Sequence, residues 1–309
     1  PGWGRNRIEG AVQSRPAGCI SRPRSWGVPI PAFYDAQGEP ILDSRIVLKT
    51  ADLVEEHGSN VWFERDVADL WAAVKPDDGD GAKHVAKSTD RLDVCIDSGS
   101  SSRAVLMQRS ELGRPGAEAN SPDAWQADYY LEGSDQHRGW FQSSLLLSLA
   151  GNGVAPYRNV LTHGFMVDAA REKISKSKQA GGHSKPQTAE AYVGQYGADI
   201  VRLWVASQDF RNDITVSEER IKKVAEAYRG IRNALRYQLS NLYDFDPAQH
   251  IVADSELTGL DRWILDAFAK LDADVRAAFD KCEFHIAYQR ITQFVAVELS
   301  AIYHDTVKD

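Results

Sequence analysis

Cysteine is scarce in this chain. The 309 residues include only Cys19, Cys95 and Cys282, which lie far apart and form no Cys-x-x-Cys pair. Cysteines this few support neither a disulfide framework nor a zinc cluster, and we expect no metal site in the chain. A reducing, cytoplasmic setting is the default expectation, although a targeting peptide ahead of Pro1 would leave no trace in this sequence.

Long apolar runs are also missing. No stretch approaches the roughly 20 apolar residues that cross a bilayer, so we expect no membrane partner. The net charge of -8 argues against binding nucleic acid through overall charge, which leaves only a local basic patch for that purpose. With 43% hydrophobic and 26% charged residues, the chain has the composition of a soluble protein with at least one full core.

Up to about residue 215, short β-rich runs alternate with helical patterns. Such alternation predicts an α/β fold with a parallel, doubly wound sheet, in which ligands bind at the carboxyl ends of the strands. A helix is expected over about 140–150, and loops over 75–81 and 113–122. The expected strands cover residues 46–48, 92–96, 127–131 and 160–167.

After residue 215 the apolar residues recur every three or four positions. Three such stripes, over 221–242, 257–275 and 284–295, predict three antiparallel helices in a bundle. Ser217, followed by two glutamates, is a suitable start for the first helix. We therefore expect two domains, 1–215 and 216–309.

The segment Lys173-Ile174-Ser175-Lys176-Ser177 lies shortly before Gly181-Gly182. Two lysines and two hydroxyls on a glycine-flanked loop suit a polyphosphate, because they supply compact positive charge and short donors. Taken alone, the pentapeptide is a weak signal, and a solvated basic loop is the more common explanation for it.

Other blocks of sequence give this segment a context. Tyr130 to Leu145 reads YLEGSDQHRGWFQSSL, and further blocks cover residues 5–7, 19–31, 92–100 and 197–204. In this order, and with Lys173–Ser177, they resemble the isoleucyl-tRNA synthetases, which are class I aminoacyl-tRNA synthetases with a signature loop written KMSKS. The resemblance covers essentially the whole chain, and Ile174 stands where the signature has Met.

The resemblance implies a fold and an activity. Residues 1–215 would be the second half of the nucleotide-binding sheet, with the KMSKS-type segment at 173–177, and residues 216–309 the start of a helical anticodon-binding domain. The full enzyme would use ATP with Mg²⁺ to convert isoleucine to isoleucyl-adenylate, and would then transfer the isoleucyl group to tRNA(Ile). It would need no zinc within this segment.

The resemblance also assigns residues. Lys173 and Lys176 would stabilise charge on the phosphates, with Ser175 as a further ATP contact. From the residues alone, Ser134 or Asp135 could instead cap a helix, Trp140 could be ordinary helix core, and His137 is expected to be structural. The aminoacyl-adenylate site would comprise Glu132, Gly133, Asp135, Gln136 and Trp140, with Trp140 as a wall for the isoleucine side chain.

Several features depart from the family pattern. The chain has no His-x-Gly-His, the histidine motif with which class I synthetases begin their nucleotide-binding fold, and it opens on Pro1. We therefore expect an internal fragment of a longer enzyme that does not form adenylate by itself. Cys95 and Gly18 stand where the family usually has tryptophans, and the tryptophan expected at Cys95 forms part of the side-chain pocket.

Two alternatives remain open from sequence. The chain could come from a valyl- or leucyl-tRNA synthetase, which share the fold and the lysine loop. It could also be a non-catalytic paralogue that binds tRNA through its helices. Arg229, Arg232 and Arg236 lie on one helix face by their spacing and suit phosphate contact, although acidic neighbours commonly neutralise such a face.

Overall fold

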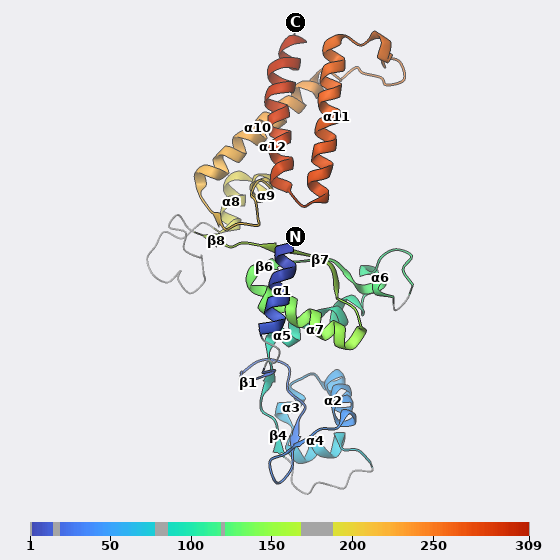
Figure 1. The fold of residues 1–309 in the computed structure, drawn as a ribbon, viewed down its shortest axis with the longest axis vertical. Coiled ribbons are helices and arrows are strands. Elements are labelled where there is room, and N and C mark those ends of the chain that lie inside the picture. The colour runs from blue at the N-terminus through green and yellow to red at the C-terminus, as the bar shows by residue number, and fades with distance from the viewer. Residues whose placement is uncertain (1, 15–18, 78–85, 119–120, 168–187, 309) are drawn as a thin grey trace. The chain divides into compact units, whose positions relative to one another are not determined.

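The computed structural model describes residues 2–14, 19–77, 86–118, 121–167 and 188–308 (Figure 1). The chain forms two compact units, Pro1–Thr162 and His163–Asp309. No helix within the described ranges is long and apolar enough to span a membrane.

The first unit contains a small lobe in which three short strands pair antiparallel in the order β3-β2-β4. Phe33, Trp62, Leu70 and Val74 are fully buried at its centre. The rings of Phe33 and Trp62 meet edge to face, with their centroids 5.1 Å apart. The Trp62 indole donates to the Ser88 carbonyl at 2.9 Å, so the buried N–H is satisfied. The lobe consists of β2 (Phe33–Tyr34), β3 (Pro40–Ile41), α2 (Ser44–His57), α3 (Val61–Glu64), α4 (Val67–Val74) and β4 (Ala86–Lys87).

The rest of the first unit carries the strand and helix that hold the predicted site. Strand β6 pairs with β7, and α7 packs closely on α5, where a Cβ added to Gly99 would lie 2.7 Å from the Ser143 hydroxyl. Strand β1 pairs antiparallel with β5. The elements are α1 (Gly2–Ser14), β1 (Ser21–Arg22), β5 (Arg91–Leu92), α5 (Val94–Gly99), the π-helix η1 (Ser102–Leu106), the 3-10 helix η2 (Ser110–Leu112), α6 (Pro122–Trp125), β6 (Ala127–Gly133), the 3-10 helix η3 (Ser134–Arg138), α7 (Trp140–Asn152) and β7 (Tyr157–His163).

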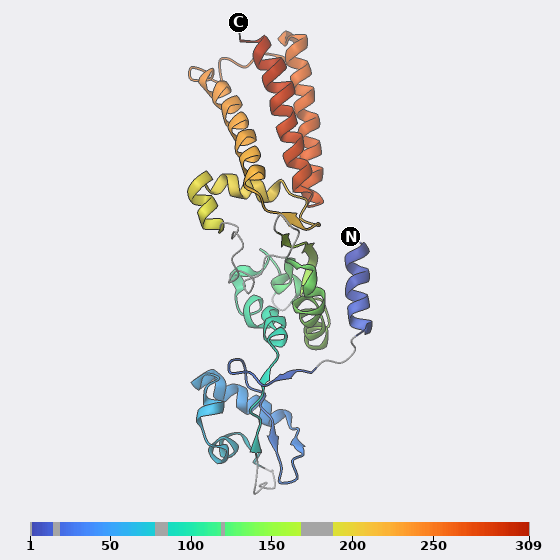
Figure 2. The same cartoon turned by 90° about the vertical axis from the view of Figure 1, so that its left-hand side faces the viewer.

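In the second unit, β8 and β9 form a parallel pair on either side of α8 and α9 in the chain, and longer helices follow. One core gathers around Ile200, Trp204, Ile221 and Val224, and a second around Ala234, Ile264, Phe294 and Leu299. Helices α11 and α12 lie side by side (Figure 2). The elements are β8 (Met166–Val167), α8 (Ala189–Tyr196), α9 (Ala198–Ala206), β9 (Ile214–Thr215), α10 (Glu218–Ser240), the 3-10 helix η5 (Asp254–Glu256), α11 (Gly259–Asp280), α12 (Phe284–Phe294) and the π-helix η6 (Val295–His304).

The structure confirms the predicted helical segment and corrects part of the strand prediction. Ser217 caps α10 by accepting the Arg220 N–H, as its position suggested. Residues 46–48 are not a strand but lie in α2, because the Asp43 carboxylate accepts the Arg45 N–H and starts a helix there. The strand expected over 92–96 ends at Leu92, since Asp93 caps α5 through the Cys95 N–H at 2.9 Å.

The strand expected over 127–131 extends to Gly133, and the helix expected over 140–150 is α7. The run 160–167 is divided between β7 and β8. The predicted domain boundary at 215 differs from the division between the two compact units, which falls at residue 162, and it stays a prediction.

Candidate functional site

The predicted adenylate residues follow one another where β6 ends and α7 begins. Gly133 is buried at the last position of the strand, whereas Glu132 and Asp135 are exposed. The chain then passes through η3 into α7, whose first residue is Trp140. The structure thus brings together Glu132, Gly133, Asp135, Gln136 and Trp140 at a strand end, which is where α/β sheets bind ligands.

Gln136 organises this turn. Its side-chain oxygen accepts the Trp140 N–H at 3.0 Å, and its side-chain nitrogen donates to Asp135 at 3.1 Å. A Cβ on Gly139 would lie 2.7 Å from the same amide oxygen, so Gly139 leaves room for this contact. Gln136 therefore satisfies the first N–H of α7, and neither Ser134 nor Asp135, which could have capped a helix, does so.

Trp140 is held in one orientation. Its ring stacks on Tyr130 with centroids 4.2 Å apart and an interplanar angle of 8°, and its indole N–H donates to the Ser98 carbonyl of α5 at 2.9 Å. Burial raises the pKa of the neighbouring Tyr157 to about 12, so that phenol stays neutral. The sequence pattern included Trp140 among the predicted site residues but did not indicate that Tyr130 and Ser98 hold it. Ser98 lies 42 residues from Trp140 in the chain, and a ring stack such as that with Tyr130 depends on the fold.

His137 occupies a structural position. It is buried, with Nδ1 3.0 Å from the Ser134 carbonyl and Nε2 3.5 Å from the Thr162 hydroxyl, and Phe141 meets it edge-on. Burial lowers the pKa of His137 below its ordinary value, so the ring is neutral near pH 7. These contacts support the structural role expected for it.

The predicted phosphate contacts lie outside the described residues. Lys173, Ser175 and Lys176 fall within 168–187, and Gly18 also lies in a range that is not described. Strand β8 precedes that segment, and α8, capped by the Thr188 hydroxyl, follows it.

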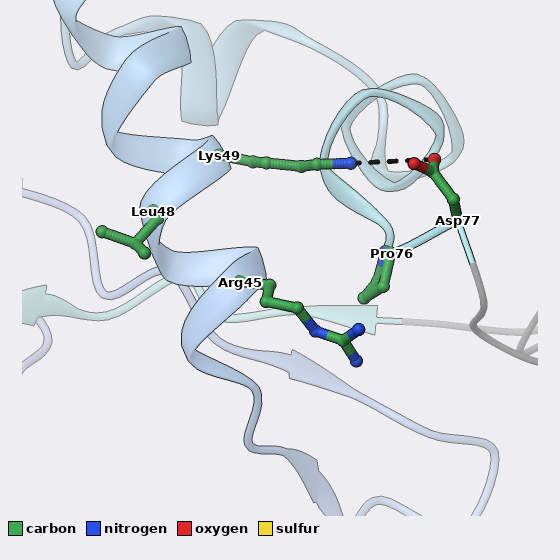
Figure 3. A pocket seen from close by; sticks show the side chains of 5 residues that line it. All are labelled: Arg45, Leu48, Lys49, Pro76 and Asp77. Atoms are coloured by element: carbon green, nitrogen blue, oxygen red, sulfur yellow. Dashed lines mark ion pairs between the residues drawn. The ribbon is translucent and has the colours of Figure 1, made fainter.

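A separate cavity of about 460 Å³ lies in the small lobe (Figure 3). Its two cations already have partners within the chain: Lys49 donates to the Lys75 carbonyl at 3.0 Å, and Arg45 pairs with Asp43 at 2.7 Å. It contains none of the predicted site residues. The cavity is lined by Arg45, Leu48, Lys49, Pro76 and Asp77.

Within the part of the chain that the structure describes, no group of three or more His, Cys, Asp or Glu side chains is placed to hold a metal ion. A Mg²⁺ ion that enters with ATP does not require such a group, because Mg²⁺ commonly binds through substrate phosphates and only one or two carboxylates.

Comparison with known proteins places the chain in a family. The family model for tRNA synthetases class I (I, L, M and V) matches residues 1–217, and that for the anticodon-binding domain of tRNA ligases matches residues 261–309. The chain therefore belongs to the class I tRNA synthetases of this group.

Its curated relatives include isoleucine–tRNA ligases. The chain is 47% identical over its whole length to that of Syntrophotalea carbinolica and 48% identical to that of Geobacter sulfurreducens, and it covers 32% of each. It thus spans about a third of the length of these relatives. They confirm the resemblance to isoleucyl-tRNA synthetases drawn from the sequence.

A solved structure shows the same fold. The leucyl-tRNA synthetase of Agrobacterium radiobacter K84, crystallised as a ternary complex with tRNA and LeuAMS, matches 90% of this chain with a TM-score of 0.59 and 19% identity. The match covers 35% of that structure's chain. It confirms the predicted fold class, an α/β synthetase domain followed by helices.

Proposed function

We propose that this chain is part of an isoleucine–tRNA ligase that activates isoleucine with ATP and transfers it to tRNA(Ile). The observation that carries the proposal is the ordered Glu132–Trp140 turn at the end of β6, in a chain whose relatives over its full length are isoleucine–tRNA ligases. The leucine alternative has weaker support, because the solved leucyl-tRNA synthetase is only 19% identical to this chain and shows the fold alone.

In the proposed reaction, the carboxylate of isoleucine attacks the α-phosphate of ATP and pyrophosphate leaves. A carboxylate needs no general base, which agrees with the neutral, buried state of His137. Glu132 and Asp135 are exposed carboxylates that can accept from the substrate ammonium or from ribose hydroxyls. Lys173, Lys176 and Mg²⁺ would stabilise the phosphate charge, with Ser175 as a further ATP contact.

The test is isoleucine-dependent exchange of pyrophosphate into ATP. Residues 1–309 would be joined to the missing parts of the Geobacter sulfurreducens ligase, and the isolated chain would be assayed beside the joined enzyme. We expect exchange only in the joined enzyme, since the histidine motif is absent from the chain. Asp135→Ala should abolish most of it, whereas Asp266→Ala, on an exposed carboxylate of α11 that pairs with Lys270, should not. Exchange that depends on valine or leucine instead would refute the assignment.

A specific observation also supports tRNA binding by α10. Arg229, Arg232 and Arg236 are exposed, and none has an ion pair with any described residue. Lys222 and Lys223 of the same helix pair with glutamates at 3.0 and 2.8 Å. A row of like charges without acidic partners destabilises a helix slightly. Contact with the phosphates of tRNA would neutralise these charges.

Salt dependence tests this part of the proposal. The affinity of the chain for tRNA(Ile) would be measured over a range of salt concentrations, and the slope of log affinity against log salt compared among variants. Replacing one contacting arginine with glutamine should reduce the slope by about 0.7–0.9. Lys223→Gln is the matched control, since Glu219 already neutralises that charge. Equal slopes in all variants would exclude the arginine row.

A further inference from the structure

The most exposed tryptophan of the chain lies on the connection that follows β1. Trp26 is 82% exposed, whereas Trp62, Trp125 and Trp204 are 7% exposed or less. An indole offers a large apolar face with a polar N–H, so an exposed one can be covered by a ligand that stacks on it. Ile20 and Val28, in the same segment, are also exposed.

The backbone around Trp26 is fixed on both sides by one strand. Arg22 pairs with Arg91 in the antiparallel β1–β5 ladder, and the Leu92 N–H donates to the Val28 carbonyl at 2.8 Å. The Arg91 guanidinium donates to the Arg24 carbonyl, inside the turn. The backbone on both sides of the exposed ring is therefore already ordered by hydrogen bonds. A ligand that stacks on the ring loses little binding free energy to ordering of the loop.

Charge around the turn is unevenly compensated. Arg22 is paired with Asp93 at 2.9 Å, and the Arg91 guanidinium lies 4.1 Å from the centre of the Phe63 ring. The exposed side chain of Arg24 has no ion pair within the described ranges. A cation without an ion pair thus lies two residues from an exposed indole, near enough to Asp93 for its charge to help lower the pKa of that carboxyl.

Proteins that bind single-stranded nucleic acid combine exposed aromatic rings with nearby cations, because bases stack on the rings and the cations neutralise phosphates. Duplex RNA offers no free base face to such a ring. We propose that Trp26 and Arg24 bind the single-stranded end of an RNA, with Trp26 stacking on an unpaired base. This inference rests on the proposed binding of tRNA, whose 3′ end is unpaired.

The experiment compares two labelled RNA hairpins that share one duplex, one with a single-stranded 3′ tail and one blunt. Each is titrated with the full chain and with variants in fluorescence anisotropy. Trp26→Ala should weaken binding of the tailed hairpin by about 5-fold to 160-fold, the effect of losing one base–aromatic stack, and should leave the blunt hairpin unchanged. Trp26→Phe should restore part of the loss.

Two further variants complete the test. Arg24→Gln should weaken binding of the tailed hairpin and reduce its salt dependence. Trp263→Ala, on an indole of α11 that is 38% exposed, should change neither affinity. If the tailed and blunt hairpins bind equally and Trp26→Ala has no effect on either, this inference is wrong while the arginine row of α10 still stands. If the chain binds neither hairpin nor tRNA, both proposals are wrong.

Discussion

Gly164 is predicted to be irreplaceable at the point where β7 ends and the chain turns into β8. A Cβ added to it would lie 2.7 Å from the Asp213 backbone nitrogen and still closer to the Asn212 carbonyl group. These are backbone atoms, which cannot swing aside as a flexible side chain can. Three hydrogen bonds fix the approach: the Gly164 N–H to the Phe210 carbonyl at 2.8 Å, the Phe165 N–H to Asp213 at 2.7 Å, and the Ile214 N–H to the Phe165 carbonyl at 2.8 Å.

Gly164→Ala should therefore push residues 164–165 away from residues 210–214. Overpacking of this kind typically costs about 1–3 kcal/mol, and losing the hydrogen bond from Phe165 to the exposed Asp213 carboxylate would add roughly 0.5–1.5 kcal/mol. Gly194→Ala is the matched control in the same unit. A methyl group added to Gly194, which lies within α8, would meet no neighbouring atom within 4 Å, so alanine should stabilise the helix by about 0.4–1 kcal/mol.

Native-state hydrogen exchange measures this locally, which matters because two compact units need not unfold together. The amides of Ile214 and Val216, which donate to Phe165 and Val167, should exchange faster in Gly164→Ala and no faster in Gly194→Ala. Unchanged protection of both amides in Gly164→Ala would show that Gly164 does not lie in close contact with the backbone of Asn212 and Asp213.

Three further predictions concern chemistry and pH. In the joined enzyme, Lys176→Ala should lower kcat for activation by about 100-fold or more and change the KM for isoleucine little, because the proposed role of the lysine is to stabilise charge that develops at the phosphates; pre-steady-state kinetics showing normal adenylate formation would exclude this role. Cys95→Trp should raise the ratio of kcat/KM for isoleucine over other aliphatic amino acids in pyrophosphate exchange, and an unchanged ratio would mean that another residue fills the pocket. Burial lowers the pKa of His304, so this histidine takes up a proton at higher pH in the unfolded chain than in the folded one. The free energy of unfolding should therefore fall as the pH drops below about 6.5. His304→Phe should reduce that fall, measured by urea titrations at about pH 7 and pH 5.

The helical segment was predictable because its signals are local. Apolar residues spaced by three or four and a serine cap at Ser217 both lie within the segment that they define. The strand expected over 46–48 failed for the opposite reason. A short aliphatic run fits a strand or a helix, and the deciding signals were the cap at Asp43 and the burial of Ile46 and Thr50 on one face of α2.

The candidate site shows the same division. Its residues are close in sequence, so a pattern over 132–140 could identify them together. What holds them could not be read from that pattern, because Trp140 depends on Ser98 from a distant helix and on a ring stack with Tyr130. Charge compensation is likewise a property of the fold. The spacing of Arg229, Arg232 and Arg236 predicts a shared face, but only the structure reveals that no described carboxylate pairs with it.

The contacts of Trp140 bear on how selective the proposed pocket can be. Ser98, whose carbonyl holds the indole, lies three residues after Cys95 on the same short helix, α5. A tryptophan that is stacked on Tyr130 and hydrogen-bonded to α5 cannot move freely to fill space left by a small side chain at position 95. If both residues line the pocket as proposed, a thiol in place of an indole would make it larger, and the extra space would reduce the cost of admitting a differently shaped aliphatic side chain. Selectivity in the full enzyme would then depend on other residues or on removal of the wrong product.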